Sequence, residues 1–228
     1  MGNFTCRIWR EVLLLLAVVY LFTSGFGSQQ GSSFPPIEQM GEGIFKFGEV
    51  ILDQKKRTIS LPAVCNQTSG LVEYGLVHVN GKIHESLFRT NVSPRLIHAS
   101  LLLLKERSFP EFFGDQNYSS SPRFFDIFVE WEWNNSSIVR PLSSMIYNES
   151  STRFLSEGRF LFTGSKKVEG QYLAEMDGSI ISIYQDARAT INNADSESEF
   201  DDVWLAHLPQ MPPLDTPVSI CLKLPNLP

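Results

Sequence analysis

Two histidines and an acidic residue in the segment GKIHESLFRTNVSPRLIHASLLLLK (81–105) are the side chains of this sequence best suited to chemistry. His84 and Glu85 are adjacent, and His98 follows in the same segment. Neutral imidazole can bind zinc or transfer a proton near neutral pH. A site shared by His84 and His98, with Glu85 and Arg89 as supporting groups, would therefore be a metal site or an acid–base site.

The same residues also fit a purely structural role, as hydrogen-bonding groups. Neighbouring residues of a strand point to opposite faces, so His84 and Glu85 reach one site only at a bulge or a strand end. Two imidazoles do not complete a metal site, and a third ligand would have to be Glu85 or a distant carboxylate such as Asp177 or Asp202. An enzyme should gather both histidines and a carboxylate around a concave pocket, whereas a binding module can leave them apart. The sequence identifies no cofactor.

Three further residues are candidates for ligand binding. Thr163 and Ser165 flank a glycine at the end of a predicted strand, where hydroxyl and backbone N–H groups can bind an anion or stabilise an oxyanion. Asp177 lies in MDGS (176–179), which is first of all a turn signal. The chain contains no phosphate-binding loop, dinucleotide fingerprint or Gly-x-Ser-x-Gly motif. These residues therefore specify no reaction.

The acidic tract NNADSESEFDD (192–202) is the one compositionally biased segment. Its carboxylates, Asp201 and Asp202 among them, are candidate calcium ligands, but their spacing is not that of an EF-hand loop. The simpler interpretation is a solvated loop.

Most of the candidate residues lie on or between predicted strands. Apolar and polar residues alternate in FFDIFVEWEW (124–133) and TPVSICLKL (216–224), which is typical of strands with one buried face. The pair Asn134–Asn135 predicts a hairpin turn after the first of these, and NGK (80–82) predicts another before IHESLF. Further strands are predicted for RTISLPAV (57–64), GLVEYGLVHV (70–79), FLFTG (160–164) and GSIISIY (178–184).

A helix is predicted to begin after Ser93, a favourable N-cap, with Pro94 at the first helical position and apolar residues recurring at helical spacing. Short helical turns are predicted at 143–147 and 187–192. Because strands outnumber helices, the predicted fold class is α+β: a single domain of mostly antiparallel β-sheet with a few packed helices.

The first 27 residues have the pattern of a signal peptide, with basic residues, an apolar core and small residues at the end. The apolar core is shorter than the ~20 residues of a membrane-spanning helix, so an uncleaved N-terminal anchor is the secondary interpretation. Residues 28–43 are predicted to be a flexible linker, and residues 44–228 the domain. The predicted location is therefore outside the cytoplasm, periplasmic or extracellular.

The net charge of -6 argues against binding to nucleic acid or to an anionic membrane surface. Membrane contact is expected at most through the N-terminal segment. The expected partner is an unidentified extracytoplasmic ligand or protein.

Removal of the leader would leave two cysteines, Cys65 and Cys221, in a compartment where disulfides persist. The sequence allows one disulfide between them, or two separate core residues.

Three blocks of the sequence carry a family pattern. They are RTISLPAVCNQTSGLVEYGLVHVNGKIHESLFRTNVSPRLIHASLLLL (57–104), FLFTGSKKVEGQYLAEMDGSIISIYQDARATINN (160–193) and DDVWLAHLPQMPPLDTPVSICL (201–222). Together they resemble YdjY-domain proteins, a family of exported bacterial proteins, from about Gly48 to the C-terminus. Departures from the family pattern stand at Asn91, Ala194 and Asp215.

The family resemblance carries no activity with it. It favours a non-enzymatic, exported binding or interaction module with a functional surface at His84 and His98. The alternative is an extracytoplasmic hydrolase or metal-dependent acid–base enzyme that uses His84, Glu85 and His98.

Overall fold

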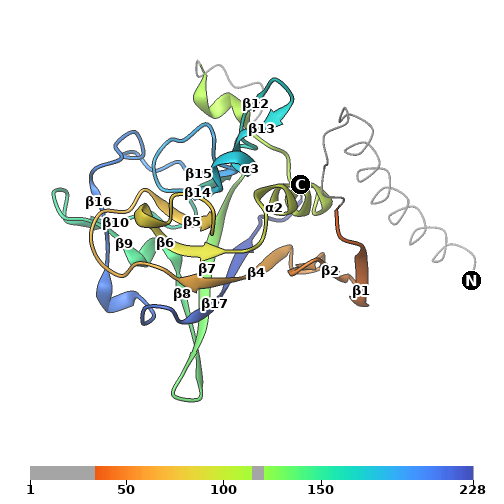
Figure 1. Cartoon of the computed structure of the whole chain (residues 1–228), viewed down its shortest axis with the longest axis horizontal. Coiled ribbons are helices and arrows are strands. Elements are labelled where there is room, and N and C mark those ends of the chain that lie inside the picture. Colours follow the sequence, from red (N-terminus) through yellow and green to blue (C-terminus); the bar gives the residue numbers. More distant parts are fainter. Residues whose placement is uncertain (1–33, 115–120, 228) are drawn as a thin grey trace, which may run out of the picture. The chain divides into compact units, whose positions relative to one another are not determined.

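The computed structural model describes residues 34–114 and 121–227, and eight of its strands close into a barrel (Figure 1). In order around the ring they are β4 (Thr58–Cys65), β17 (Pro217–Lys223), β7 (Phe124–Trp133), β11 (Phe160–Phe162), β15 (Ile191–Asn193), β14 (Ser179–Ser182), β5 (Tyr74–His78) and β6 (Ser86–Thr90), which pairs with β4 again. The pairs β14–β15 and β5–β6 are parallel, and the other neighbours are antiparallel. The predicted α+β fold is therefore wrong: the chain is mostly β, and its sheet is mixed and closed.

The barrel interior is built by strands whose side chains alternate between buried and exposed positions. Along β7, Ile127 and Val129 are buried, whereas Asp126 and Glu130 on either side of them are partly or fully exposed. β4 and β17 show the same alternation, which the sequence pattern had predicted. In β11, β14 and β15 every residue is buried, so other parts of the chain cover both faces of these strands.

β4 closes the barrel because its free edge is shared between two partners. Its first half pairs with β3 (Val50–Asp53), ending at Ile51↔Ser60, and its end pairs with β6, beginning at Val64↔Arg89. Pro62 lies between these two contacts. Its carbonyl accepts a hydrogen bond from Thr90 Oγ1 (2.6 Å), so the side of Pro62 that lacks an N–H faces the gap between the two partners. A proline is tolerated here because no ladder bond is lost.

Both parallel pairs are joined by unusually short connections. The chain returns from β5 to β6 through residues 79–85 and from β14 to β15 through residues 183–190, whereas parallel strands usually need a dozen or more residues. The hairpin predicted at residues 80–82 is therefore wrong, because the strands on either side of it run parallel. The helical turn predicted at 187–192 is also wrong, since that segment is a return loop and the start of β15.

The barrel sheet is extended at two places. β1 (Ile37–Gly41), β2 (Ile44–Phe47) and β3 continue it beyond β4, and β8 (Ser136–Pro141) pairs with β7. Asn134 and Asn135, both with positive φ, form the predicted turn of the long β7–β8 hairpin, which projects from the barrel in Figure 1. β1 falls within the segment 28–43 that was predicted to be a linker. The predicted signal peptide lies outside the described residues.

The remaining elements are short. Two small sheets contain β9 (Ile146–Asn148), β10 (Arg153–Phe154) and β16 (Trp204–Ala206), and β12 (Lys167–Val168) and β13 (Gln171–Tyr172). The 3₁₀ helices are η1 (Ile83–Glu85), η2 (Pro110–Phe113), η3 (Leu142–Met145), which covers part of the turn predicted at 143–147, and η4 (Leu208–Gln210).

The α-helices of the described chain are α2 (Pro94–Leu103) and α3 (Leu173–Asp177). The predicted start of α2 is confirmed, since the Ser93 side chain accepts a hydrogen bond from the Leu96 N–H. α3 was not predicted. Among the described helices, none has the length and apolar character needed to cross a membrane.

A buried ion cluster fixes the end of α2 to the last residues of the chain. Glu106, whose side chain is inaccessible, accepts hydrogen bonds from Arg57 (2.8 Å) and Arg123 (2.7 Å). Both arginines also donate to the carbonyl of Pro225. The buried carboxylate is thus fully paired, which a charge in this position requires.

The return loop 183–190 should depend on Asn192. The side-chain amide of this buried residue takes the place of backbone hydrogen bonds from a neighbouring strand. Its Oδ1 accepts from the Asp186 N–H (2.8 Å), and its Nδ2 donates to the Asp186 carbonyl (2.9 Å). Asn192→Ala leaves both backbone groups buried without partners, so we expect the free energy of unfolding to fall by about 3 kcal/mol in urea denaturation. The exposed Asn80→Ala should change it by less than about 0.5 kcal/mol. A loss below about 1 kcal/mol for Asn192→Ala would contradict this role.

Candidate functional site

The two candidate histidines have different environments. His98, on α2, donates to or accepts from the Tyr172 hydroxyl through Nδ1 (3.0 Å) and packs edge-on against the Phe162 ring. Burial, together with the charge of Lys167, lowers the pKa of His98 to about 4. His98 is therefore a neutral, hydrogen-bonded group of the packed interior at physiological pH.

His84 lies on η1 at the surface, with its side chain 74% exposed. Its Nε2 is 3.2 Å from Glu85 Oε1, so the adjacent pair does meet, because η1 is not a strand. His84 thus contacts Glu85, whereas His98 contacts Tyr172 and Phe162. The structure therefore brings together His84 and Glu85 but leaves His98 in a separate setting.

Glu85 belongs to a cluster in which the two return loops meet. The Tyr74 hydroxyl, on β5, donates to Asp186 Oδ2 (3.0 Å), contacts the Tyr184 hydroxyl (3.0 Å) and accepts from Lys82 Nζ (3.2 Å). Lys82 Nζ also lies 3.8 Å from Glu85 Oε2. This group of side chains is the most densely connected polar cluster near η1.

Tyr74 and Lys82 keep their protons at neutral pH and can therefore donate hydrogen bonds within the cluster. Burial raises the pKa of Tyr74, with contributions from the hydrogen bonds of Tyr184 and from the charge of Asp186, so its hydroxyl stays protonated. Burial alone would lower the pKa of Lys82, but the oxygen groups around it raise it overall. Neither group is therefore activated as a nucleophile or base at neutral pH.

Two carboxyl groups share this cluster. Burial and the nearby charge and hydrogen bond of Glu85 raise the pKa of Glu73, although Lys82 at 3.5 Å opposes the shift. The backbone N–H of Glu73 also donates to the Glu85 carbonyl (2.9 Å), which extends the parallel pairing of β5 and β6 by one residue. The carboxyl pair thus lies at the junction of a strand and its return loop.

Arg89, expected to support His84, has other partners. Its guanidinium donates to Asn66 Oδ1 (2.8 Å) and Asp215 Oδ1 (2.7 Å). The Asn66 amide in turn donates to the carbonyls of Ile83 and Ser86 (2.9 Å to the latter). Arg89 therefore holds the residue that anchors η1.

The groups predicted to bind an anion bond to the protein itself. The N–H groups of Thr163 and Gly164 both donate to the Thr190 carbonyl, at 3.2 and 3.0 Å. Ser165 Oγ donates to the Arg188 carbonyl (2.6 Å) and accepts from the Ala174 N–H (3.1 Å). These donors are therefore already used.

The remaining acidic candidates lie at the surface. Asp177 forms an ion pair with Arg188. Asp201 and Asp202 are exposed in the loop before β16. Among residues 34–114 and 121–227, no three His, Cys, Asp or Glu side chains converge as metal ligands.

The tract 192–202 is only in part the solvated loop that its composition indicates. Its end is exposed, but its first two residues belong to β15, and Asp195 is buried against Arg153. Burial alone would raise the pKa of Asp195, but hydrogen bonds from Arg153 and Ser156 lower it well below the usual range. The start of the tract is therefore part of the folded core.

Of the two alternatives that the sequence left open for Cys65 and Cys221, the disulfide does not form: both cysteines are free. Cys221 lies opposite Ser60 in the β17–β4 ladder, on the outer face, whereas Cys65 lies beyond the end of that ladder among buried residues. Burial raises the pKa of Cys65 to about 11, so its thiol is unreactive at neutral pH.

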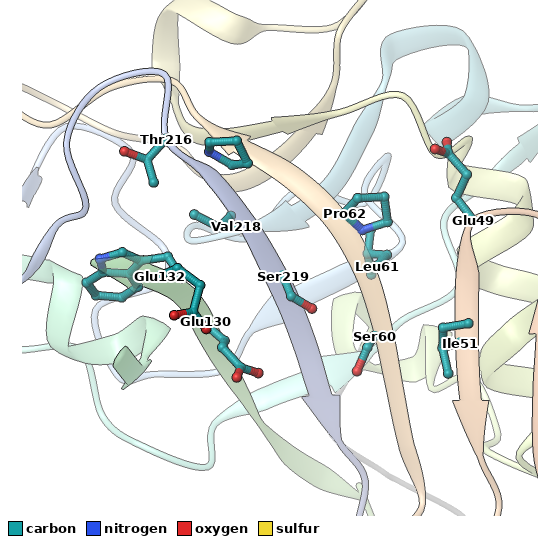
Figure 2. A pocket seen from close by; sticks show the side chains of 12 residues that line it. Glu49, Ile51, Ser60, Leu61, Pro62, Glu130, Glu132, Thr216, Val218 and Ser219 are labelled. Atoms are coloured by element: carbon teal, nitrogen blue, oxygen red, sulfur yellow. The ribbon is translucent and has the colours of Figure 1, made fainter. Parts of the chain in front are cut away.

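A groove of about 520 Å³ lies on the opposite wall of the barrel, across β3, β4, β17 and β7 (Figure 2). Its lining residues are Glu49, Ile51, Ser60, Leu61, Pro62, Glu130, Trp131, Glu132, Thr216, Pro217, Val218 and Ser219. Figure 2 shows Glu130 and Glu132 on one flank, Glu49 on the other, and Ser219 and Pro62 between them. The groove therefore carries carboxylates on both flanks, and the lining between them contains hydroxyls, prolines and apolar side chains such as Ile51 and Val218.

The groove carboxylates are available to a ligand. Glu130 accepts one hydrogen bond, from Ser137 Oγ (2.8 Å). Within the described part of the chain, none of Glu49, Glu130 and Glu132 forms an ion pair, and no basic side chain lines the groove. The site thus presents three uncompensated negative charges in a concave surface.

Sequence reasoning missed this groove. Glu130 and Glu132 were recognised as the outward positions of a strand, which is usually a solvated face. Glu49 lies far away in the sequence, in the turn before β3, and the pairing of β3, β4, β17 and β7 brings that turn to the opposite flank of the groove. The one local signal was the pair of glutamates at alternate positions of a single strand.

Comparison of the chain with protein-family models, with curated proteins and with solved structures finds no match. The site must therefore be interpreted from its own chemistry.

The stability of the fold should decrease between pH 7 and pH 4.5 because of His98. Its folded-state pKa of about 4 lies below the unfolded value of about 6.5, so the unfolded chain takes up a proton first as the pH falls. We expect this residue to account for about 2 kcal/mol of the loss, measured by urea denaturation at both pH values. His98→Gln should remove that part of the pH dependence, and the exposed His84→Gln should retain it. Equal pH dependence in wild type and His98→Gln would refute the assignment.

Proposed function

We propose that this protein is an exported, non-enzymatic binding module that holds a cationic ligand in the groove across β3, β4, β17 and β7. The observation that carries this proposal is the lining of the groove, with three glutamates and no basic side chain. The groove volume of about 520 Å³ falls in the usual range for ligand sites. Ammonium and guanidinium groups are the natural partners of such carboxylates.

The contents of the groove favour binding over catalysis. Its lining, taken from the described residues, contains no histidine, lysine or cysteine, and no hydroxyl of the lining is hydrogen-bonded to a groove glutamate as a nucleophile is to its base. Of the two candidate histidines, His84 is exposed and His98 is buried, and they have different neighbours. This is the arrangement expected of a module rather than of an enzyme built on both histidines.

The proposal includes export from the cytoplasm and membership of the YdjY-domain family. The leader-like N-terminus supports an extracytoplasmic location, where the groove would meet ligands outside the cytoplasm. The resemblance to YdjY-domain proteins stays a prediction, and it agrees with a protein that binds without known catalysis.

Pentalysine is a suitable probe for this function. We expect it to bind at about 20 mM salt, where screening is weak, and pentaglutamate not to bind. The triple variant Glu49→Gln, Glu130→Gln, Glu132→Gln should weaken pentalysine binding about tenfold in isothermal titration calorimetry. This corresponds to about 1.4 kcal/mol, or roughly 0.5 kcal/mol for each exposed ion pair.

A matched control separates the groove from the overall charge. Glu38, Glu157 and Glu199 are exposed and lie outside the groove, so their triple replacement by Gln changes the net charge equally. Binding should then change less than about twofold, because long-range effects are small compared with direct contacts. The proposal fails if pentalysine does not bind, or if both triple variants lose affinity alike.

A further inference from the structure

We infer that Glu73 and Glu85 share one proton, and that this proton keeps the loop 79–85 closed against β5 in mildly acidic solution and lets it open as the pH rises. Both carboxyl groups belong to the polar cluster around Lys82, and neither lines the groove. The pH response is therefore present whether or not the groove binds a cation.

Glu73 lies between the two loops that join the parallel strands. Its N–H donates to the Glu85 carbonyl (2.9 Å) in the loop 79–85, and its carbonyl accepts from the Ile183 N–H (2.8 Å) in the loop 183–190. The side chains of Glu73 and Glu85 are only 22% and 31% exposed. A change of charge on this pair therefore acts where the loop 79–85 is attached to β5.

One oxygen of Glu85 lacks a donor. Its Oε1 is 3.2 Å from His84 Nε2, whereas Oε2 is buried and, in the described part of the chain, has no hydrogen-bond partner. Lys82 Nζ lies 3.8 Å from Oε2, beyond hydrogen-bond range. A buried acceptor without a donor is costly. A hydrogen bond with Glu85 contributes to the raised pKa of Glu73, so a proton on Glu73 supplies the missing donor.

The charges around the pair favour one proton over none. Lys82 is the cation closest to Glu73, at 3.5 Å, and it also lies near Glu85 and Asp186. Two adjacent carboxylates repel each other, so the pair keeps a proton to a higher pH than an isolated carboxyl group. The titratable and charged side chains that face the pair are Tyr74 from β5, Lys82 and His84 from the loop 79–85, and Tyr184, Asp186 and Arg188 from the loop 183–190, the last of these paired with Asp177.

The direction of the response follows from the raised pKa of Glu73, which burial and the charge of Glu85 cause. The stabilisation of the closed loop is complete below the ordinary value of 4.5 and is lost as the pH rises through the higher folded-state value. The proton leaves Glu73 for water, and Glu85 Oε2 loses its donor in the same step. The two carboxylates then repel each other, and the loop that carries the exposed His84 opens.

Hydrogen exchange measured by NMR tests this response. The Glu73 N–H, which donates to the Glu85 carbonyl, reports whether the loop is attached. Between pH 5 and pH 8, after correction for intrinsic exchange rates, we expect its protection to fall about fivefold, the effect of one hydrogen bond. Amides of the β17–β7 ladder are the internal reference and should change less than about twofold.

Variants identify the proton. Glu73→Gln places a permanent N–H donor beside Glu85 Oε2, so it should keep the pH 5 protection at pH 8. Glu85→Gln should also remove the pH dependence, because a single carboxylate then remains in the pair. His84→Gln should retain the wild-type response, since the imidazole contacts Oε1 and not Oε2. The exposed Glu38→Gln is the matched control for the change in net charge and should also retain it.

Three results would overturn the shared proton. They are constant protection of the wild-type Glu73 N–H between pH 5 and pH 8, a wild-type response in Glu73→Gln, and loss of the response in His84→Gln, which would make the imidazole the sensor. A ¹³C titration of the Glu73 carboxyl carbon gives a second measurement that does not need this variant to fold. Its midpoint should be higher in wild type than in Glu85→Gln, and equal midpoints would also overturn the proposal.

Discussion

The hydroxyl of Tyr74 links the two short connections that join the parallel strand pairs of the barrel. Both parallel pairs depend on a short return of the chain, and the two returns meet at this atom, where Lys82 comes from one loop and Tyr184 and Asp186 come from the other. Because neither of these described crossovers, 79–85 and 183–190, contains an α-helix, side chains must satisfy many of the buried polar groups of each loop. Asn192 does so for the backbone of Asp186.

This solution makes the two walls of the barrel different. The strands of the wall formed by β5, β14 and β15 are largely buried on both faces, and residues of the return loop 183–190 bond to this wall. The wall of β3, β4, β17 and β7 is antiparallel, and side chains on the outer face of β4, β17 and β7 are at least partly exposed. The groove is found there for this reason, and the dense polar cluster around Lys82 is explained by the closed wall.

Local patterns of the sequence predicted the elements that local physics determines. The alternation in 124–133 and 216–224, the Asn134–Asn135 turn and the Ser93 cap were all correct, because each depends on neighbouring residues. The direction of β6 relative to β5 was not predictable in this way. NGK is a good hairpin signal, but the chain passes through it into η1 and turns back, and contacts with Asn66 and Tyr74 decide that path.

In the candidate site, too, the sequence indicated residue types but not the contacts between residues that are far apart in the chain. Residue type drew attention to His84 and His98, since imidazole is the side chain most often used in chemistry, yet burial and the bond to Tyr172 account for His98. The groove glutamates are ordinary residues that acquire a role through register. Glu49 and Glu130 lie on opposite flanks of the groove because β17 pairs with β4 on one side and with β7 on the other, and so separates the two flanks. A change in that register by one residue would turn Ser219 inward and remove the site without altering any of its glutamates.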